Sequence, residues 1–251
     1  MKIFPIKTSI IGPGQNLAEI ILEAIYGQGL ELQDGDIIAV ASKAVSTATN
    51  RIINLKEIKP SRKALELASK YSLEPEFVEL IMRESEKIYG GVERAILTMK
   101  NGILTVNAGI DHKNVPEGCA SLWPLNPHLE ADKLRRQIEA KTRRKVGVLI
   151  VDSEVSPLRL GTRGFALAIS GFKPVRDYRG KMDIYGRKIA ITLHSMADDL
   201  ASAAHAVMGE SAEQIPAVLI RNAPILLDEN AKSEDLRIES KKCVYASSFR
   251  L

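Results

Sequence analysis

Apolar residues follow two spacings along the chain, and each spacing predicts one kind of element. Short apolar runs predict strands at residues 2–6, 37–41, 95–99, 103–106, 146–151, 189–193 and 216–220. The run at 146–151 is nearly continuous, which is typical of a strand covered on both faces. Apolar positions three or four residues apart predict helices after Asn16 and at residues 61–70, 75–87, 130–141 and 197–207.

Turn-forming residues separate these segments. Lys100-Asn101-Gly102 lies between two apolar runs and predicts a β-hairpin. Residues 183–187 predict a turn, and residues 123–127, which contain two prolines, exclude a helix. Residues 159–171 are rich in glycine and small side chains and predict a loop.

The order of these elements predicts the fold class. Strands and helices are interleaved without a regular βαβ alternation, and no repeat or linker divides the chain. We therefore predict an α+β fold with mixed sheets and packed helices, rather than a doubly wound parallel sheet. The polar C-terminal part, residues 228–251, is helix-prone at 233–241.

Composition excludes several classes of protein. The 251 residues are 45% apolar and 26% charged, which is ordinary for a globular protein with a substantial core. The net charge of +4 is too mild to support a nucleic-acid surface. No run approaches the roughly 18 apolar residues of a spanning helix, and Cys119 and Cys243 have neither disulfide-framework nor zinc-site spacing. We expect a soluble, cytoplasmic protein with small-molecule partners.

Two aspartates that follow apolar runs are candidate metal ligands. Asp111 ends the segment Asn107-Ala-Gly-Ile-Asp111, in which Gly109 permits a turn or a close backbone approach, and Asp152 follows the run at 146–151. Carboxylates and hydroxyls are the donors that Mg²⁺ and Mn²⁺ prefer. The alternative interpretation is that each aspartate forms a turn or caps a helix.

A second candidate segment follows the run at 37–41. Ser42, Lys43, Ser46 and Thr47 are polar residues suited to phosphate oxygens, and the alternative is a solvated loop with local hydroxyl-to-backbone bonds. The four histidines are scattered and we assign none of them a role. His112, beside Asp111, is the only one near the candidate site in the sequence.

Several short motifs, in order and at nearly the right separations, resemble one family over residues 2–222. These motifs are Phe4-Pro5, Asp34-Gly-Asp36, Val45-Ser46, Arg83-Glu-Ser-Glu86, Asn107-Ala-Gly-Ile-Asp111 with Asn114, Val151-Asp152-Ser153, Gly164-Phe165-Ala166, Ile169-Ser-Gly171, Asp183-Ile-Tyr-Gly186, Ala197-Asp198, Met208-Gly-Glu210 and Ile215-Pro-Ala217. The family is that of the coenzyme F420-0:L-glutamate ligases, which attach glutamate to a deazaflavin cofactor using GTP.

The resemblance implies an F420-0 gamma-glutamyl ligase-like fold and an amide ligation. A substrate carboxylate would attack the γ-phosphate of GTP to give an acyl phosphate, which the amine of L-glutamate would then displace. The resemblance also implies a homodimer, two divalent ions (Mn²⁺ or Mg²⁺) and a monovalent cation. It further implies a catalytic domain at residues 1–222 and a polar, helical C-terminal extension of that domain at residues 223–251.

The resemblance assigns site residues position by position. Asp111 and Asp152 would be catalytic. The metal ligands would be Asp111, Asp152, Ser153 and Glu210, with serine at 153 where the family usually has threonine. The nucleotide-binding residues would be Ile10, Ile11, Ser42, Lys43, Thr47, Asn114, Met208, Gly209, Glu210, Ser211 and Ile215.

The chain departs from the family pattern at functional positions. Thr47 stands where the family usually has a lysine near the nucleotide, and Val155 and Ser156 stand where it usually has glycine and arginine. Lys43, Arg159 and Arg163 are candidates to replace the lost cations. Two alternatives therefore stay open: a paralogous ligase with a different acceptor acid, and a non-catalytic relative that binds nucleotide.

Overall fold

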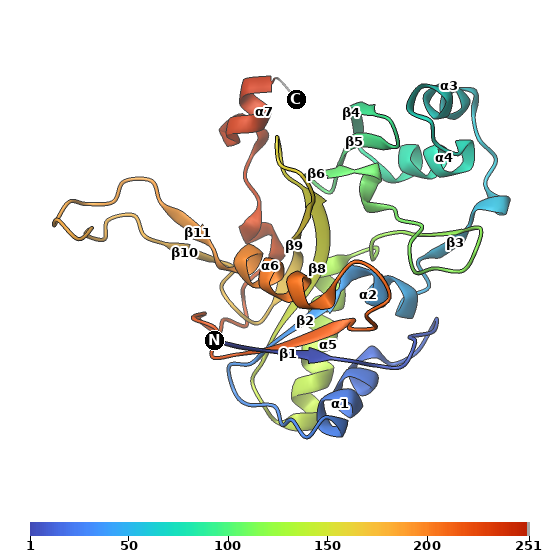
Figure 1. Cartoon of the computed structure of the whole chain (residues 1–251). Helices are drawn as coiled ribbons and strands as arrows, with labels where there is room; N and C mark the ends of the chain where they lie inside the picture. Colours follow the sequence, from blue (N-terminus) through green and yellow to red (C-terminus); the bar gives the residue numbers. More distant parts are fainter. Residues whose placement is uncertain (250–251) are drawn as a thin grey trace.

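A five-stranded mixed sheet forms the centre of the molecule in the computed structural model, which describes residues 1–249 (Figure 1). Its strand order is β1 (Lys2–Ile6), β12 (Ala217–Arg221), β2 (Ile37–Ala41), β8 (Gly147–Val155) and β9 (Thr162–Ser170). β2 and β8 run parallel, and the other neighbouring strands run antiparallel. The predicted α+β class with mixed sheets is confirmed.

Helices cover both faces of this sheet. Alternate side chains of a strand point to opposite faces, so Ile38 and Val40 pack with α1 (Leu17–Gly27) and α5 (Pro127–Thr142). Ile37 and Ala39 pack on the other face with α6 (Met196–Met208). This two-sided burial explains why the apolar run at 146–151 is continuous, because Gly147 to Val151 are all buried in β8.

A second group of elements has its own apolar core, at the upper right of Figure 1. It comprises α3 (Arg62–Tyr71), α4 (Pro75–Glu84), the sheet β4 (Lys87–Val92), β5 (Ala95–Lys100) and β6 (Ile103–Val106), and the strand pair β3 (Ile52–Asn54) and β7 (Cys119–Ser121). The short helix α2 (Ser42–Ala48) connects β2 to this group. The hairpin predicted around Asn101 is confirmed, since β5 pairs with β6.

Two segments lie outside these cores. The pair β10 (Val175–Asp177) and β11 (Leu193–Ser195) forms the base of an arm that projects to the left in Figure 1. The C-terminal segment contains η3 (Ser233–Leu236), η4 (Ser240–Lys242) and α7 (Val244–Phe249). It is anchored on β9, because the Ile169 N–H donates to Ser233 Oγ at 3.0 Å. Within residues 1–249 no helix has the length and apolar character needed to cross a membrane.

Several predicted boundaries are wrong. Most of residues 159–171 form strand β9 rather than a loop, because Gly164 and Ala166 make room for α6. A Cβ at Gly164 would lie 2.4 Å from the Ala201 carbonyl oxygen. The strand predicted at 189–193 lies instead at Leu193–Ser195, where β10 offers a partner.

Helix boundaries also differ from the prediction. α4 ends at Glu84, and Lys87 begins the unpredicted strand β4. Pro127 is the first residue of α5, a position where its missing N–H costs no hydrogen bond. The predicted C-terminal helix at 233–241 is replaced by the two short 3₁₀ turns η3 and η4.

Candidate active site

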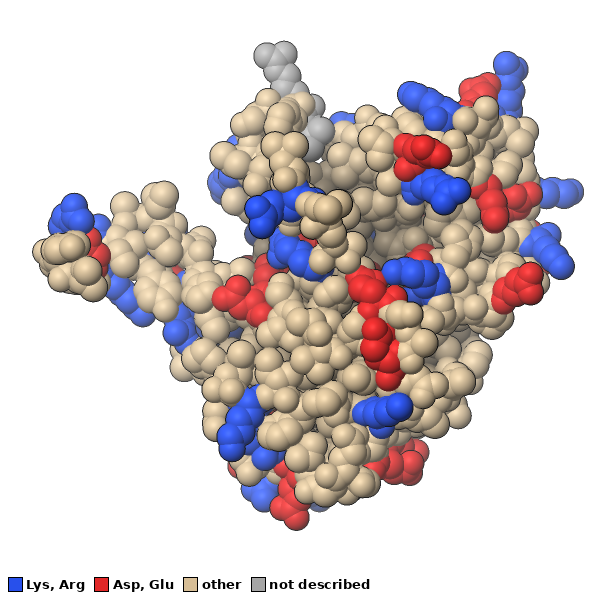
Figure 2. Space-filling model, viewed as in Figure 1, with Lys and Arg blue, Asp and Glu red and all other residues tan. Residues whose placement is uncertain are grey.

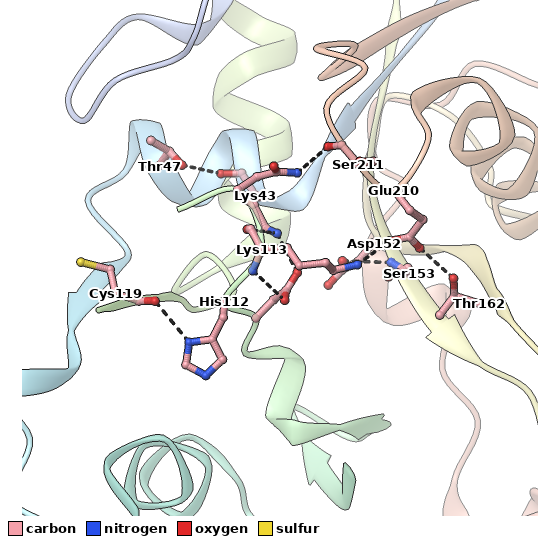
Figure 3. Close-up of polar contacts among 12 residues, drawn as sticks. Lys43, Thr47, His112, Lys113, Cys119, Asp152, Ser153, Thr162, Glu210 and Ser211 are labelled. Carbon is pink, nitrogen blue, oxygen red and sulfur yellow. Dashed lines mark hydrogen bonds and ion pairs between the residues drawn. The ribbon is translucent and has the colours of Figure 1, made fainter. Parts of the chain in front are cut away.

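A cavity of about 490 Å³ lies where α2 and β8 meet the loop after β6 and the segment after α6. Every residue predicted to bind nucleotide or metal lines it. These residues are Ile10, Ile11, Ser42, Lys43, Thr47, Asp111, Asn114, Asp152, Ser153, Met208, Gly209, Glu210, Ser211 and Ile215. The structure thus brings together segments that are up to about 200 residues apart in the sequence, and Figure 3 shows many of their polar contacts.

One wall is the start of α2. The alternative interpretation of this segment as a solvated loop is wrong, because α2 begins at Ser42, directly after β2, and buries Ser42 and Ser46. Lys43 Nζ reaches across the cavity and donates to Asp111 Oδ2 at 2.6 Å and to the Lys113 carbonyl at 2.5 Å. Thr47 Oγ1 donates to the Lys43 carbonyl at 2.9 Å, so its hydroxyl is engaged within its own helix.

Asp111 is positioned by the turn before it. Asn107, Ala108 and Gly109 have φ values of 52°, 53° and 68°, and Asn107 Oδ1 fixes this left-handed turn by accepting from the Ile96 N–H at 2.8 Å. Asp111 then pairs with Ser121 through backbone hydrogen bonds, and its Oδ1 accepts from the Lys113 N–H at 3.0 Å. Burial opposes ionisation, but Lys43 and the Lys113 N–H outweigh it and lower the pKa of Asp111.

Asp152, on β8, is the most buried of the carboxylates of Asp111, Asp152 and Glu210. The Ser153 N–H donates to its Oδ1 at 2.9 Å, and the Trp123 indole N–H donates to its Oδ2. The indole packs against Gly109, where an added Cβ would lie 2.1 Å from Trp123 Cε2. Burial raises the pKa of Asp152 despite these donors.

Glu210 follows the end of α6 at the cavity rim. It accepts from Lys113 Nζ at 2.8 Å, Thr162 Oγ1 at 2.7 Å and His205 Nε2 at 2.9 Å (Figure 3 draws the first two partners). Burial opposes its ionisation, but these hydrogen bonds dominate and lower the pKa of Glu210 to about 2. Close by, Asn114 Nδ2 donates to the Ser211 carbonyl at 2.7 Å and joins two walls of the cavity.

Among the cavity residues that the sequence did not assign to the site, Lys113, Trp123 and His205 hydrogen-bond to its carboxylates. Lys113 lies two residues after Asp111, and His205 lies three residues before Met208, so both are close in the sequence to predicted site residues. The sequence assigned no histidine a role, and in the structure His205 lines the cavity and contacts Glu210. His112 instead stacks on Phe77 at 4.1 Å and faces the Cys119 carbonyl.

Of the three cations proposed to replace the lost ones, Lys43 lines the cavity. Arg163 pairs with Glu154 at 2.5 Å and donates to Ser156 Oγ at 2.7 Å, and neither it nor the exposed Arg159 is among the lining residues. The prediction that either arginine supplies the cavity with charge is therefore not supported by their positions.

The cavity has the donor chemistry of a divalent-ion site. The carboxylates of Asp111, Asp152 and Glu210 and the Ser153 hydroxyl are hard oxygen donors of the kind that Mg²⁺ and Mn²⁺ prefer. Their present spacing is wider than a closed site, since no three His, Cys, Asp or Glu side chains of residues 1–249 converge to hold an ion. Lys43 and Lys113 instead neutralise Asp111 and Glu210. The residues fit such ions chemically, provided that these lysines give way.

The fold and the cavity define a class: an α+β protein with a concave, charged cavity of small-molecule size. A family model described as F420-0:Gamma-glutamyl ligase matches residues 5–222. The chain belongs to this family.

Similar proteins agree with the family match. A coenzyme F420:L-glutamate ligase of Archaeoglobus fulgidus is 37% identical over 245 residues, covering 97% of this chain and 96% of the relative. One from Methanothermobacter thermautotrophicus is 39% identical over 216 residues, or 86% of each chain. One from Methanopyrus kandleri is 40% identical over 212 residues, covering 84% and 82%. The first similarity extends beyond residue 222 into the C-terminal segment.

Proposed function

We propose that this chain is a GTP-dependent coenzyme F420:L-glutamate ligase that works with two divalent ions. The observation that carries the proposal is the convergence of every expected nucleotide and metal residue on one cavity. The relatives that bear this activity in their names are similar over at least four-fifths of the chain.

The proposed reaction has two steps. A carboxylate oxygen of the acceptor bonds to the γ-phosphorus, and the bond from that phosphorus to the bridging oxygen breaks, releasing GDP. The glutamate amine then bonds to the acyl carbon, phosphate leaves and the amine loses a proton. Bound divalent ions would neutralise charge on the phosphoryl oxygens.

The chain's own residues would position the substrates and neutralise their charge. Lys43 and Lys113 bring positive charge to the cavity, and Asp111, Asp152, Ser153 and Glu210 would hold the ions. Ile10, Ile11 and Ile215 supply an apolar part of the wall suited to a nucleotide base. Such an arrangement requires positioning and electrostatic stabilisation rather than a protein nucleophile. In this proposal residues 1–222 are the catalytic domain, and residues 223–251 extend it.

The first test is calorimetric titration of the protein with GTP and ATP, each with and without Mn²⁺. We expect Mn²⁺-dependent binding of GTP that Asp152→Asn weakens by about 100-fold or more, exceeding the 10–100-fold effect of outer-sphere partners. The amide of Asp152→Asn keeps an acceptor for Trp123 while removing the charge, and Asp152→Ala removes both. Asp199→Ala, at an exposed aspartate of α6, is the matched control.

Two results would contradict the proposal. Unchanged Mn²⁺ affinity in Asp152→Asn would refute the metal assignment, and binding of neither nucleotide would mean that the chain keeps the fold but has lost the family's chemistry. If GTP binds, turnover assays with F420-0 and other carboxylic acids test the acceptor. Trapping with hydroxylamine then tests the acyl phosphate, because the expected hydroxamate forms only from an activated carboxylate.

A further inference from the structure

Two lysine ammonium groups enter the cavity, and they are held differently. Lys43 Nζ lies between Asp111 Oδ2 and the Lys113 carbonyl, and 25% of its side chain is exposed. Lys113 Nζ donates to Glu210 Oε2 at 2.8 Å, and 57% of its side chain is exposed. Lys113 is therefore the less enclosed of the two cations.

Thr47 gives the α2 wall of the cavity one cation fewer than the family resemblance implies. It stands where a lysine was expected to meet the nucleotide, and its hydroxyl donates to the carbonyl of Lys43 in the same helix. Lys113 lines the same cavity from the loop after Asp111. A lysine is a point charge on a flexible stem, so it serves a phosphate from more than one anchoring position.

We propose that Lys113 is the phosphate-binding cation of this chain, in the role that Thr47 has lost, and that Glu210 holds its ammonium group until the nucleotide binds. This inference rests on the proposed function. Binding would transfer the ammonium group from Glu210 to a phosphate oxygen, which frees the Glu210 carboxylate for a divalent ion. Lys113 and Glu210 thus change partners together, and neither is left as an unpaired charge in a partly buried site.

The exchange predicts effects of opposite sign for two ligands. Lys113 competes with a divalent ion for Glu210, so its removal strengthens the binding of the ion alone. Lys113 also contributes a charge-assisted hydrogen bond to the phosphates, so its removal weakens the binding of the nucleotide. A variant that is merely destabilised would bind both ligands less well.

The test compares Lys113→Met with the unaltered protein by calorimetry, using Mn²⁺ alone and then GTP with saturating Mn²⁺. We expect about 5-fold tighter Mn²⁺ binding, since the competing charge is gone, and about 10- to 100-fold weaker GTP binding. Lys63→Met removes an exposed lysine of α3 outside the cavity and is the matched control. The double variant Lys113→Met with Thr47→Lys should recover most of the GTP affinity.

The outcomes separate the two proposals. If the unaltered protein binds GTP and Lys113→Met leaves that affinity unchanged, the role of Lys113 is refuted while the proposed function stands. If both ligands bind more weakly, Lys113 has a structural role and the exchange is refuted. If the unaltered protein binds no nucleotide at all, both proposals fail.

Discussion

Two groups of charged side chains in this molecule have the same chemistry and different surroundings. In the first, which we call the buried network, Glu84 accepts from Arg51 Nη2 at 3.0 Å and from Lys100 Nζ at 2.7 Å, and all three side chains are at most 22% exposed. The second consists of the cavity pairs, Lys43 with Asp111 and Lys113 with Glu210, in which the side chains are 25–57% exposed.

The difference shows that the enclosure of an ion pair, rather than the residue types in it, decides whether a ligand can replace one of the partners. The buried network is sealed behind Trp123: Arg51 Nε donates to the Trp123 carbonyl at 3.1 Å, and Lys100 Nζ lies 5.4 Å from the centre of its ring. A ligand in the cavity cannot replace these partners. The cavity pairs are open to solvent, so an ion or a phosphate can replace one of the partners.

The charged side chains of the surface are the most exposed case in this comparison. On the face seen in Figure 2, positive and negative side chains lie in small mixed groups rather than in one extended region. Exposed pairs of this kind contribute little to stability, because solvent screens them and their side chains lose freedom when paired. We therefore expect a larger electrostatic effect on stability from the buried network than from the exposed pairs.

The largest expected effect comes from Glu84→Ala, which leaves Lys100 and Arg51 without their carboxylate. Removing one member of an enclosed ion pair costs about 3 kcal/mol, because a charge is left without a partner. Urea titration followed by the fluorescence of Trp123, the one tryptophan of the chain, measures the change in the free energy of unfolding. Glu66→Ala breaks the exposed pair with Arg62 and should change it by less than about 0.5 kcal/mol. Equal losses in the two variants would mean that enclosure does not decide how much an ion pair contributes to stability.

The free energy of unfolding at acidic pH gives a second test of the buried network. Although burial opposes ionisation, Lys100 and Arg51 lower the pKa of Glu84 below its usual 4.5. A carboxyl group with a lowered pKa in the folded state contributes stability that is present above 4.5 and is lost as the pH falls through the folded-state pKa. The unaltered protein should therefore lose stability below pH 4.5 more steeply than Glu84→Gln does.

The next effect concerns a cavity pair. Asp111→Asn removes the charge that faces Lys43 while keeping the shape of the side chain, and it should weaken Mn²⁺ binding by about 10-fold or more. The free energy of unfolding should change by less than about 1 kcal/mol, because solvent already screens this pair. Calorimetry with Mn²⁺ and urea titration of the same sample measure both quantities. A large loss of stability with unchanged Mn²⁺ affinity would place Asp111 with the buried network instead.

The sequence predicted those parts of the fold that depend on local patterns. The buried run of β8, the cap of α1 at Asn16 and the hairpin around Asn101 each carry their signal within a few residues. β9 was missed because its small residues resemble a loop, and the reason for them lies on α6, more than 30 residues further along the chain. A strand of this kind is recognisable only once its neighbour is known.

The candidate site divides in the same way. The family resemblance assigned residues such as Asp152 and Glu210, and the structure places them in one cavity. The side chains that hydrogen-bond to them, Trp123 to Asp152 and Lys113 to Glu210, are 29 and 97 residues away in the sequence. Spacing along the chain carries no information about such contacts, because the fold creates them.

The smallest expected effect is a gain from Thr47→Lys in the otherwise unaltered protein. The new ammonium group would lie one helical turn from Lys43, and repulsion between like charges at this spacing offsets part of its attraction for phosphate. With Lys113 still present, we expect GTP to bind only about 3-fold more tightly, well below the gain in the Lys113→Met background. Thr49→Lys is the matched control for added charge, because Thr49 is the C-cap residue of α2 and does not line the cavity. Equal gains in both backgrounds would mean that the two positions do not serve the same phosphates, and no gain in either would mean that this face of α2 has another role.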